Sequence, residues 1–412
     1  MPAPRTADIA APDGRDPLPP LPARRDLPQA SAVAALFDGK PHRPRDIVVM
    51  IATSNADETR LELMGDYNVL LVGQTPVALL DQVLVHFRLP GNRDLQQIVA
   101  ELNADPRVIS VQPNYIYRLL DDAQASGRHK QYSLAALRIP AAHGFATGRN
   151  VGVAVIDSCV DASHPDLDGT IARQFDAFAR AEQDIPCVAP DAHGTAIAGI
   201  ISARGELTGI APRAHLLAAR AFSHEGTGDD TPEATTVTLA SSLDWAAGHD
   251  ARIYNLSFAG PDDPVMRRIM TELSARDYVL VGAAGNDGPD APPVYPAAYD
   301  GVLAVTAIDA GTEPYVDANR GDYIDLAAPG VDILVLAPED SYDIASGTSY
   351  AAAHLSGVIA LMLERSEDLN RGRLVQFLSR TARDLGAAGR DPVFGAGLAN
   401  AQDALDALGR SR

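Results

Sequence analysis

Several side chains that could bind a metal ion lie close together near residue 160. The stretch VAVIDSCVDASHPDL, residues 153–167, contains Asp157, Cys159, Asp161, His164 and Asp166. Carboxylate, imidazole and thiol groups are common metal ligands, so a metal hydrolase is one hypothesis. Its ligands would be Asp157, Cys159, His164 and His193. This hypothesis leaves the serine-containing segment near residue 349 unexplained.

That segment predicts a nucleophile on a rigid support. SGTSYAAAHLSGVIALMLE, residues 346–364, is almost wholly apolar after its first residues, which predicts a helix buried on all sides. Ser349 would lie in the first turn, beside unpaired backbone N–H groups and at the positive end of the helix dipole. A serine in this position can also simply cap the helix, and the pattern alone does not exclude that role.

Two further polar residues lie at places where elements begin or end. His193 precedes a predicted helix at 194–204, and Asn286 follows a buried strand in a glycine-rich turn. The Asn286 amide could donate to an oxyanion, or it could stabilise the turn. By itself, His193 would be an ordinary residue at the start of a helix. Only the combination of these signals is specific.

Apolar runs alternate with helical patterns beyond residue 133, which predicts an α/β fold. The strands are expected at 151–157, 215–222, 251–258, 278–286 and 301–308, and the helices between them at 194–204, 236–250 and 263–277. Continuous apolar runs are typical of a doubly wound parallel sheet flanked by helices. Ligands bind at the carboxyl ends of such strands, where Asp157 and Asn286 fall.

The residues before this region divide into three parts. Residues 1–44 are rich in Pro and Ala and predict a flexible arm. Residues 45–119 show the order β-α-β-β-α-β, which predicts a small α+β domain of ferredoxin-like type. Residues 120–132 are polar and predict a linker, and residues 133–412 form the large domain.

Composition excludes several classes of partner. The 412-residue chain has a formal net charge of -20, so nucleic acids and anionic membranes would repel it. It has no apolar run long enough for a transmembrane helix, and its first 30 residues lack the apolar core of a secretory signal. Its two cysteines, Cys159 and Cys187, cannot form a disulfide framework or a four-cysteine zinc site.

Asp157, His193 and Ser349 occur in the order found in subtilisin. The blocks VAVIDS, HGTAIAG, NLSFAG, AAGN, AAPG and SGTSYAAAH resemble the successive signatures of subtilisin-like serine proteases, the subtilases, over residues 133–405. The resemblance implies a serine endopeptidase with Ser349 as nucleophile, His193 as general base and then acid, and Asp157 as its partner. Asn286 and the Ser349 backbone N–H would form the oxyanion hole.

The same resemblance implies a zymogen. Residues 45–119 are similar to the family's inhibitory prodomain, so the expected partners are peptide or protein substrates and the chain's own prodomain. Residues 120–132 would then be the processing linker, cut near Ala125 or Ser126. A prodomain also favours export, although this chain shows no signal peptide.

The resemblance further implies how substrate binds. Two edge segments would pair with an extended peptide through Gly226, Thr227, Gly228, Leu256, Ser257 and Phe258. Ala259 and Val294 stand where the family commonly has glycine in its main specificity pocket. The extra carbon atoms predict a preference for small residues before the scissile bond.

Some positions depart from the family pattern. Asp166 matches an aspartate of the family's strong calcium site, but SARGELTGIAP leaves little room for the loop that completes it. We expect no required cofactor and no strong calcium site, with Asp166 as a weak metal candidate. Cys159 replaces a usual glycine and could form a disulfide with Cys187, or both could be free thiols. A bridge would imply an oxidising compartment.

A catalytically silent binding protein with the same fold is the alternative function. Cys159, and Ala353 in place of the family's usual proline, keep this alternative open. The filled positions at Asp157, His193, Ser349 and Asn286 argue against it.

Overall fold

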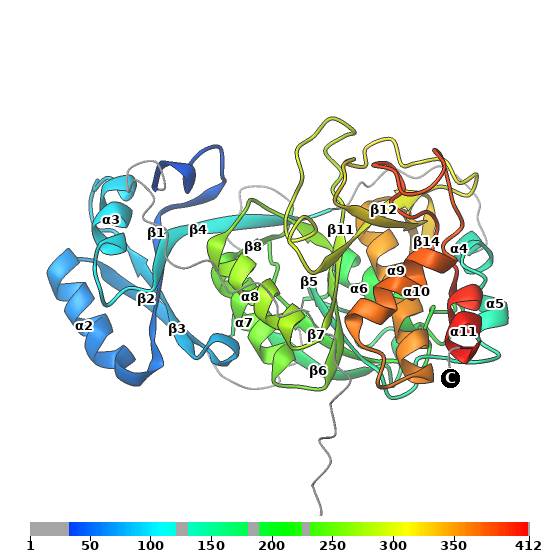
Figure 1. Ribbon diagram of the computed structural model, residues 1–412. Helices are drawn as coiled ribbons and strands as arrows, with labels where there is room; N and C mark the ends of the chain where they lie inside the picture. The colour runs from blue at the N-terminus through cyan, green and yellow to red at the C-terminus, as the bar shows by residue number, and fades with distance from the viewer. Residues whose placement is uncertain (1–32, 121–130, 180–188, 225–230, 411–412) are drawn as a thin grey trace, which may run out of the picture.

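The computed structural model describes residues 33–120, 131–179, 189–224 and 231–410. Two sheets dominate it, a large one in the middle of the molecule and a smaller one near the N-terminus (Figure 1). Seven strands form the large sheet, in the order β13-β12-β11-β9-β5-β7-β6, and all neighbours are parallel. This confirms the predicted α/β architecture.

The strands of the large sheet have the following bounds. They are β5 (Gly152–Asp157), β6 (Ile171–Asp176), β7 (His215–Arg220), β9 (Ala251–Leu256), β11 (Val279–Ala283), β12 (Val302–Ile308) and β13 (Ile324–Pro329). The sequence did not predict β6 and β13. Both are edge strands. IARQFD of β6 is largely exposed or half-buried and carries two polar residues in its middle, whereas IDLAAP of β13 is mostly buried but its short apolar run is interrupted by Asp325.

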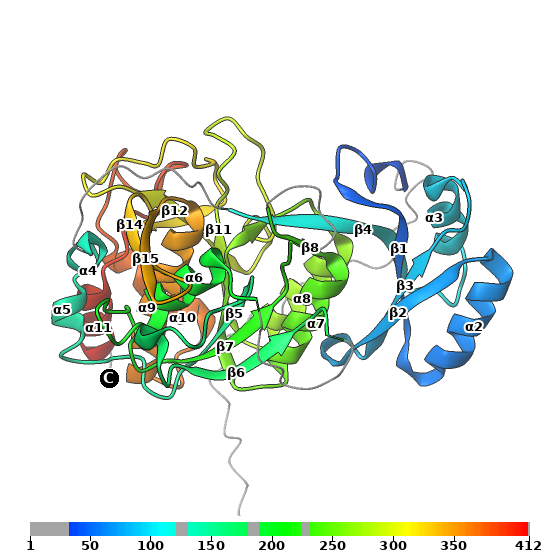
Figure 2. The ribbon, with the colours of Figure 1, turned by 180° about the vertical axis from the view of Figure 1, so that it is seen from behind.

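Helices cover both faces of this sheet (Figure 2). Because side chains alternate along a strand, Val153 and Val155 of β5 face one hydrophobic core, while Ala154 and Ile156 face the other. The first core includes residues of α6 (Ala192–Ser202) and α9 (Thr348–Arg365), and the second includes residues of α7 (Thr236–Ala247) and α8 (Pro264–Ala275). Strand β5 therefore lies between two layers of helices.

The chain ends in α10 (Arg371–Thr381) and α11 (Ala401–Arg410), and an antiparallel hairpin of β14 (Ile333–Ala337) and β15 (Ser341–Ala345) precedes α9. Residues Thr348 to Leu363 of α9 are all buried, as the apolar sequence predicted. None of the helices in the described parts of the chain is both long and apolar enough to cross a membrane.

The smaller sheet is antiparallel and lies beside α7 and α8 (Figure 1). Its elements are β1 (His42–Ala52), α2 (Ala56–Tyr67), β2 (Leu70–Val77), β3 (Gln82–Arg88), α3 (Leu95–Asn103) and β4 (Ser110–Leu119). We call these elements the N-terminal unit. One face of the sheet packs on α2 and α3, with Leu63 and Ile98 in that core. The other face, with Met50 and Leu84, joins the core that contains α7 and α8.

Strand β4 continues beyond its own sheet into the large part of the molecule. It pairs antiparallel with β8 (Glu233–Thr235) and with β10 (Phe258–Ala259). In Figures 1 and 2, β4 extends away from the other strands of the N-terminal unit toward β8 and β11. One strand therefore belongs to both parts of the molecule and lies between two segments of the larger part.

Candidate active site

Asp157 lies at the carboxyl end of β5, between β7 and β9, and no part of it is exposed. Its Oδ1 atom accepts hydrogen bonds from the Ser158 backbone N–H at 2.7 Å and from His193 Nδ1 at 2.7 Å. A carboxylate removed from water needs such donors to stay charged. The bond also places the Nδ1 proton on His193, because the carboxylate can only accept, and leaves Nε2 as the proton acceptor of the ring.

His193 is positioned by the N-terminus of α6. Asp191 is the N-cap of this helix, and its Oδ1 atom accepts from the His193 backbone N–H at 3.0 Å and from the Ser158 hydroxyl at 2.6 Å. Its Oδ2 atom accepts from His224 Nε2 at 2.8 Å. Burial opposes ionisation of Asp191, but the hydrogen bonds from Ser158 and His224 hold its pKa below the usual value. Asp191 therefore ties α6 to the turn that follows Asp157.

Ser349 is the second residue of α9 and is fully buried. Its hydroxyl donates to the Ser257 carbonyl oxygen at 3.0 Å, and the Ser257 hydroxyl donates to the Ser349 carbonyl oxygen at 3.1 Å. The next residue, Tyr350, brings α9 to His193, with 5.9 Å between the two ring centroids. Among the described residues, no hydrogen bond joins Ser349 to His193. Hydrogen bonds of catalytic groups are often loose without substrate, so this geometry is compatible with a nucleophile.

Asn286 follows β11 and is oriented by the start of α9. Its Oδ1 atom accepts from the Thr348 backbone N–H at 3.1 Å and from the Thr348 hydroxyl at 2.9 Å. Because a backbone N–H can only donate, these bonds fix which end of the amide is the oxygen. Asn286 Nδ2 is buried and has no hydrogen-bond partner among the described residues. The amide therefore presents a donor that none of the described residues uses.

Gly347 lies beside that donor and beside the end of β4. A Cβ atom on Gly347 would lie 3.1 Å from Asn286 Nδ2 and 2.8 Å from the Leu120 carbonyl oxygen. Both atoms therefore flank the same glycine, which has no side chain to separate them. The carbonyl group of the residue after β4 is thus next to the unused amide donor, beside a glycine only two residues before Ser349.

The predicted substrate residues fall into three groups. Leu256 ends β9, Ser257 contacts Ser349, and Phe258 and Ala259 form β10, which pairs with Leu119 and Arg118 of β4. Val294 precedes Tyr295, which exchanges backbone hydrogen bonds with Gly260, so Val294 and Ala259 lie on neighbouring segments. Gly226, Thr227 and Gly228 lie outside the described residues.

Cys159 is buried and disulfide-bonded. Its predicted partner, Cys187, lies outside the described residues, so the pairing stays a prediction. The Cys159 carbonyl oxygen accepts from the Asp191 backbone N–H at 2.8 Å. This contact places the disulfide next to the Asp157 turn and the α6 N-terminus.

Asp166 is buried, and its carboxylate is hydrogen-bonded to the chain instead of facing solvent. Its carboxylate accepts from the backbone N–H groups of Glu206 at 3.0 Å and Leu207 at 2.7 Å. These donors come from the short loop after α6, the loop in which the sequence left little room for a calcium site. Within the described residues, no group of three or more His, Cys, Asp or Glu residues could hold a metal ion. The expectation that no strong calcium site exists stays a prediction.

The metal-hydrolase hypothesis finds no support in this geometry. The Cys159 sulfur forms a disulfide, and His164 Nδ1 accepts a hydrogen bond from the Asp166 backbone N–H at 3.1 Å.

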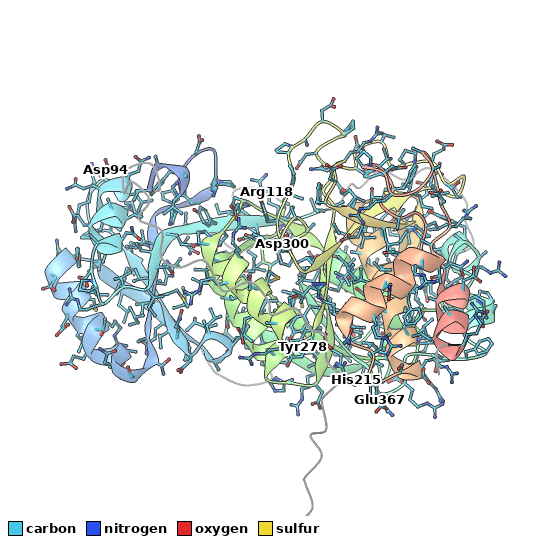
Figure 3. All side chains as sticks on the ribbon, in the orientation of Figure 1. Asp94, Arg118, His215, Tyr278, Asp300 and Glu367 are labelled. Carbon is cyan, nitrogen blue, oxygen red and sulfur yellow. The ribbon has the colours of Figure 1, made fainter. Side chains whose placement is uncertain are left out.

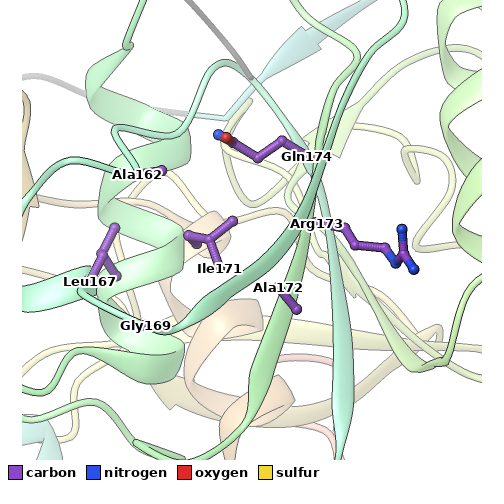
Figure 4. Close-up of a pocket in the computed structure, with 7 residues that line it drawn as sticks. All are labelled: Ala162, Leu167, Gly169, Ile171, Ala172, Arg173 and Gln174. Carbon is purple, nitrogen blue, oxygen red and sulfur yellow. The ribbon is translucent and has the colours of Figure 1, made fainter. Parts of the chain in front are cut away.

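A hollow beside β6 is lined by Ala162, Leu167, Gly169, Ile171, Ala172, Arg173 and Gln174 (Figure 4). It contains none of the predicted site residues.

Three contributors to the site were not predicted from the sequence. Asp191 could have been found as an N-cap, because an aspartate just before a predicted helix is a common start signal. Thr348, which orients Asn286, and strand β8, which pairs with β4, gave no local signal. Both act through residues that are far away in the sequence.

Comparison with known proteins adds evidence of ancestry. A family model described as "Subtilase family" matches residues 148–397. Minor extracellular protease Epr of Bacillus subtilis is 31% identical over 319 residues, covering 74% of this chain and 47% of that protein. Subtilisin E of Bacillus subtilis is 30% identical over 317 residues, covering 75% of this chain and 78% of that protein.

A solved structure agrees with these similarities. The crystal structure of fervidolysin from Fervidobacterium pennivorans, described as a keratinolytic enzyme related to subtilisin, aligns with a TM-score of 0.76 and 26% identity. The alignment covers 90% of this chain and 62% of that chain. The present chain therefore spans about half of Epr and less than two thirds of the fervidolysin chain.

A buried histidine in α9, the helix that carries Ser349, leads to a prediction about the stability of the protein in acid. Burial lowers the pKa of His354 in α9 to about 4, below the 6.5 of an exposed histidine. As the pH falls from about 6.5 to 4, His354 therefore becomes protonated in the unfolded chain but stays neutral in the folded chain. We expect a loss of up to about 3 kcal/mol in the free energy of unfolding across this window.

Chemical denaturation at several pH values, with wild type and His354→Asn compared, measures this loss. The amide nitrogen of the introduced asparagine takes the place of His354 Nδ1, which donates to the Tyr350 carbonyl oxygen at 2.8 Å, but it does not titrate. The wild type should lose more stability than the variant between pH 6.5 and 4. Parallel curves for the two proteins would show that His354 does not contribute.

Proposed function

Because the chain belongs to the subtilase family of serine endopeptidases, we propose that it hydrolyses peptide bonds through an acyl-enzyme formed on Ser349. His193 is the general base and Asp157 its partner. The observation that carries this proposal is the 2.7 Å hydrogen bond between His193 Nδ1 and the buried Asp157 carboxylate. That bond sets the tautomer in which Nε2 can accept a proton.

The chemical steps follow from that tautomer. Rotation of the Ser349 hydroxyl from the Ser257 carbonyl oxygen toward His193 lets Nε2 take its proton while Oγ attacks the substrate carbonyl carbon. Asp157 stabilises the imidazolium that forms. His193 then gives the proton to the leaving amine, and water repeats the sequence on the acyl-enzyme to release the acid and restore Ser349.

The oxyanion of each tetrahedral intermediate needs donors that are already in place. Asn286 Nδ2 is held by the bonds between its Oδ1 atom and Thr348, so little reorganisation is required. The Ser349 backbone N–H, at the N-terminus of α9, is the second donor in this proposal. The helix dipole of α9 adds to the stabilisation of negative charge.

The N-terminal unit is, in this proposal, an inhibitory prodomain. Strand β4 occupies the space between β8 and β10, where an extended substrate would pair, and the Leu120 carbonyl oxygen lies beside Gly347 and Asn286. This arrangement favours cleavage of the bond after Leu120. The cut expected from the sequence near Ala125 or Ser126 concerns residues outside the described part of the chain.

The preferred residue before the scissile bond is small or aliphatic. Ala259 and Val294 lie on two neighbouring segments, and each has more carbon atoms than the glycine that is common in the family's main specificity pocket. The pocket is therefore too narrow for aromatic and long basic side chains. Leu120 is buried at the corresponding position, so we expect the preference for small residues to extend to leucine.

Replacement of the nucleophile tests the main proposal. Wild-type protein should hydrolyse peptides, be labelled at Ser349 by a serine-directed phosphonofluoridate, and lose its N-terminal unit. Ser349→Ala should stay full length and lose more than about 10⁴-fold in kcat/KM, with a change in unfolding free energy of about 1 kcal/mol. Mass spectrometry and peptide hydrolysis measure these outcomes. A folded wild type without hydrolysis or label would instead support the catalytically silent alternative.

A second variant tests the oxyanion donor separately. Asn286→Ala should keep the fold and the phosphonofluoridate site but lose about 10² to 10³-fold in kcat, the range found for related proteases. Asn286→Asp is the matched variant of equal size, and it should be no faster because its carboxylate has no proton to donate. Rates close to wild type in Asn286→Ala would remove Asn286 from the mechanism.

Peptides that differ only at the residue before the scissile bond test the pocket. Ala and Leu should be cleaved at least about tenfold faster than Phe and Lys, measured as kcat/KM, because the larger groups must displace Ala259 or Val294. Cleavage of the Phe or Lys peptide as fast as the Ala peptide would overturn this preference.

A further inference from the structure

One side chain of β4 is buried in a pocket of the large part of the molecule. Tyr117 of β4 pairs with Ala234 of the neighbouring strand β8, and only 1% of Tyr117 is exposed. Its ring meets Phe258 edge-on, with 6.0 Å between centroids. A Cβ atom on Gly260 would overlap the Tyr117 ring, so the absence of a side chain there creates the space for an aromatic residue.

The end of this pocket carries a carboxylate. The Tyr117 hydroxyl donates to Asp263 Oδ2 at 2.9 Å, and Asp263 is fully buried. The large part of the molecule supplies three other donors to this carboxylate. They are the Thr236 hydroxyl at 2.7 Å and the backbone N–H groups of Val265 at 2.8 Å and Met266 at 3.1 Å.

Asp263 belongs to the large part of the molecule and stays there if the N-terminal unit leaves. As the N-cap of α8, it is held by bonds to the first turn of that helix. It would lose two donors with the N-terminal unit, the Tyr117 hydroxyl and Gln112 Nε2, which lies 2.8 Å from Oδ1. A buried carboxylate that loses donors becomes a binding site for a group that restores them.

The strand register assigns this pocket to one position of a substrate. If the bond after Leu120 is cleaved, Tyr117 is the fourth residue before that bond. Leu119 pairs with Phe258 and Arg118 with Ala259, so a peptide that takes the place of β4 has the same register. The side chain of Arg118, labelled in Figure 3, is 62% exposed instead of buried. Alternation along the strand therefore directs the fourth side chain, but not the third, into the pocket.

We propose that the pocket formed by Phe258, Gly260 and Asp263 selects tyrosine at the fourth position before the scissile bond of protein substrates. This inference rests on the proposed function. Phenylalanine fills the same apolar space but leaves the Asp263 carboxylate without the phenolic donor. A site built to hydrogen-bond a hydroxyl group discriminates strongly against the analogue that lacks it.

Peptides of the series X-Arg-Leu-Leu, with X as Tyr, Phe or Ala and a reporter amine after the last leucine, test the inference on the active enzyme obtained from the full chain. The Tyr peptide should exceed the Phe peptide by about tenfold to a hundredfold in kcat/KM, the range expected for a hydrogen bond to a charged group. Equal rates for Tyr and Phe would overturn the inference alone. Absence of cleavage of all three peptides would overturn the proposed function with it.

A pair of neighbouring variants assigns the selectivity to one carboxylate. Asp263→Asn keeps an oxygen that can cap α8 but removes the charge, and it should reduce the Tyr to Phe ratio to below about threefold. Asp262→Asn is the matched control, because Asp262 is partly exposed and pairs with Arg267. It should leave the ratio unchanged. A ratio that falls equally in both variants, or in neither, would overturn the role of Asp263.

Discussion

The hydrogen bond between Asp157 and His193 joins two segments that are 36 residues apart, and much of the structure serves to maintain it. A fully buried carboxylate is costly unless donors surround it, and the turn after β5 and the start of α6 provide them. Asp191 links these two segments again through Ser158 and caps the helix that carries the imidazole. Any movement of α6 relative to β5 would break several bonds at once, so the imidazole has a defined position.

The central parallel sheet makes this arrangement possible. Strand β5 has neighbours on both sides, and helices cover both of its faces, so the end of the strand is fixed in three dimensions. Helix α9 is buried along most of its length and contributes Ser349 at its N-terminus. Thr348, the residue before Ser349, orients Asn286, which follows β11. The proposed nucleophile and the proposed oxyanion donor are thus connected through adjacent residues of one rigid helix.

Strand β4 gives the N-terminal unit its relation to this site. The unit packs one face of its sheet on its own helices, while the other face shares a core with α7 and α8. The same strand then pairs with β8 and β10 and ends beside Gly347. In the proposed zymogen, one continuous strand would therefore combine a large apolar interface with occupation of the site. The bond between Tyr117 and Asp263 would add side-chain recognition to main-chain pairing, which by itself is insensitive to side chains.

The sequence alone determined the α/β class, the family, and the order of Asp157, His193 and Ser349. It could do so because buried parallel strands are continuous apolar runs and because each signature block is local. It did not predict the edge strands β6 and β13, whose apolar runs are interrupted by polar residues. The tertiary structure alone decided which groups meet: Thr348 with Asn286, Asp191 with Ser158 and His224, and β4 with β8 and β10. Tyr117 and Asp263 are 146 residues apart, so no local pattern could relate them; only the packing of the two parts of the chain brings them into contact.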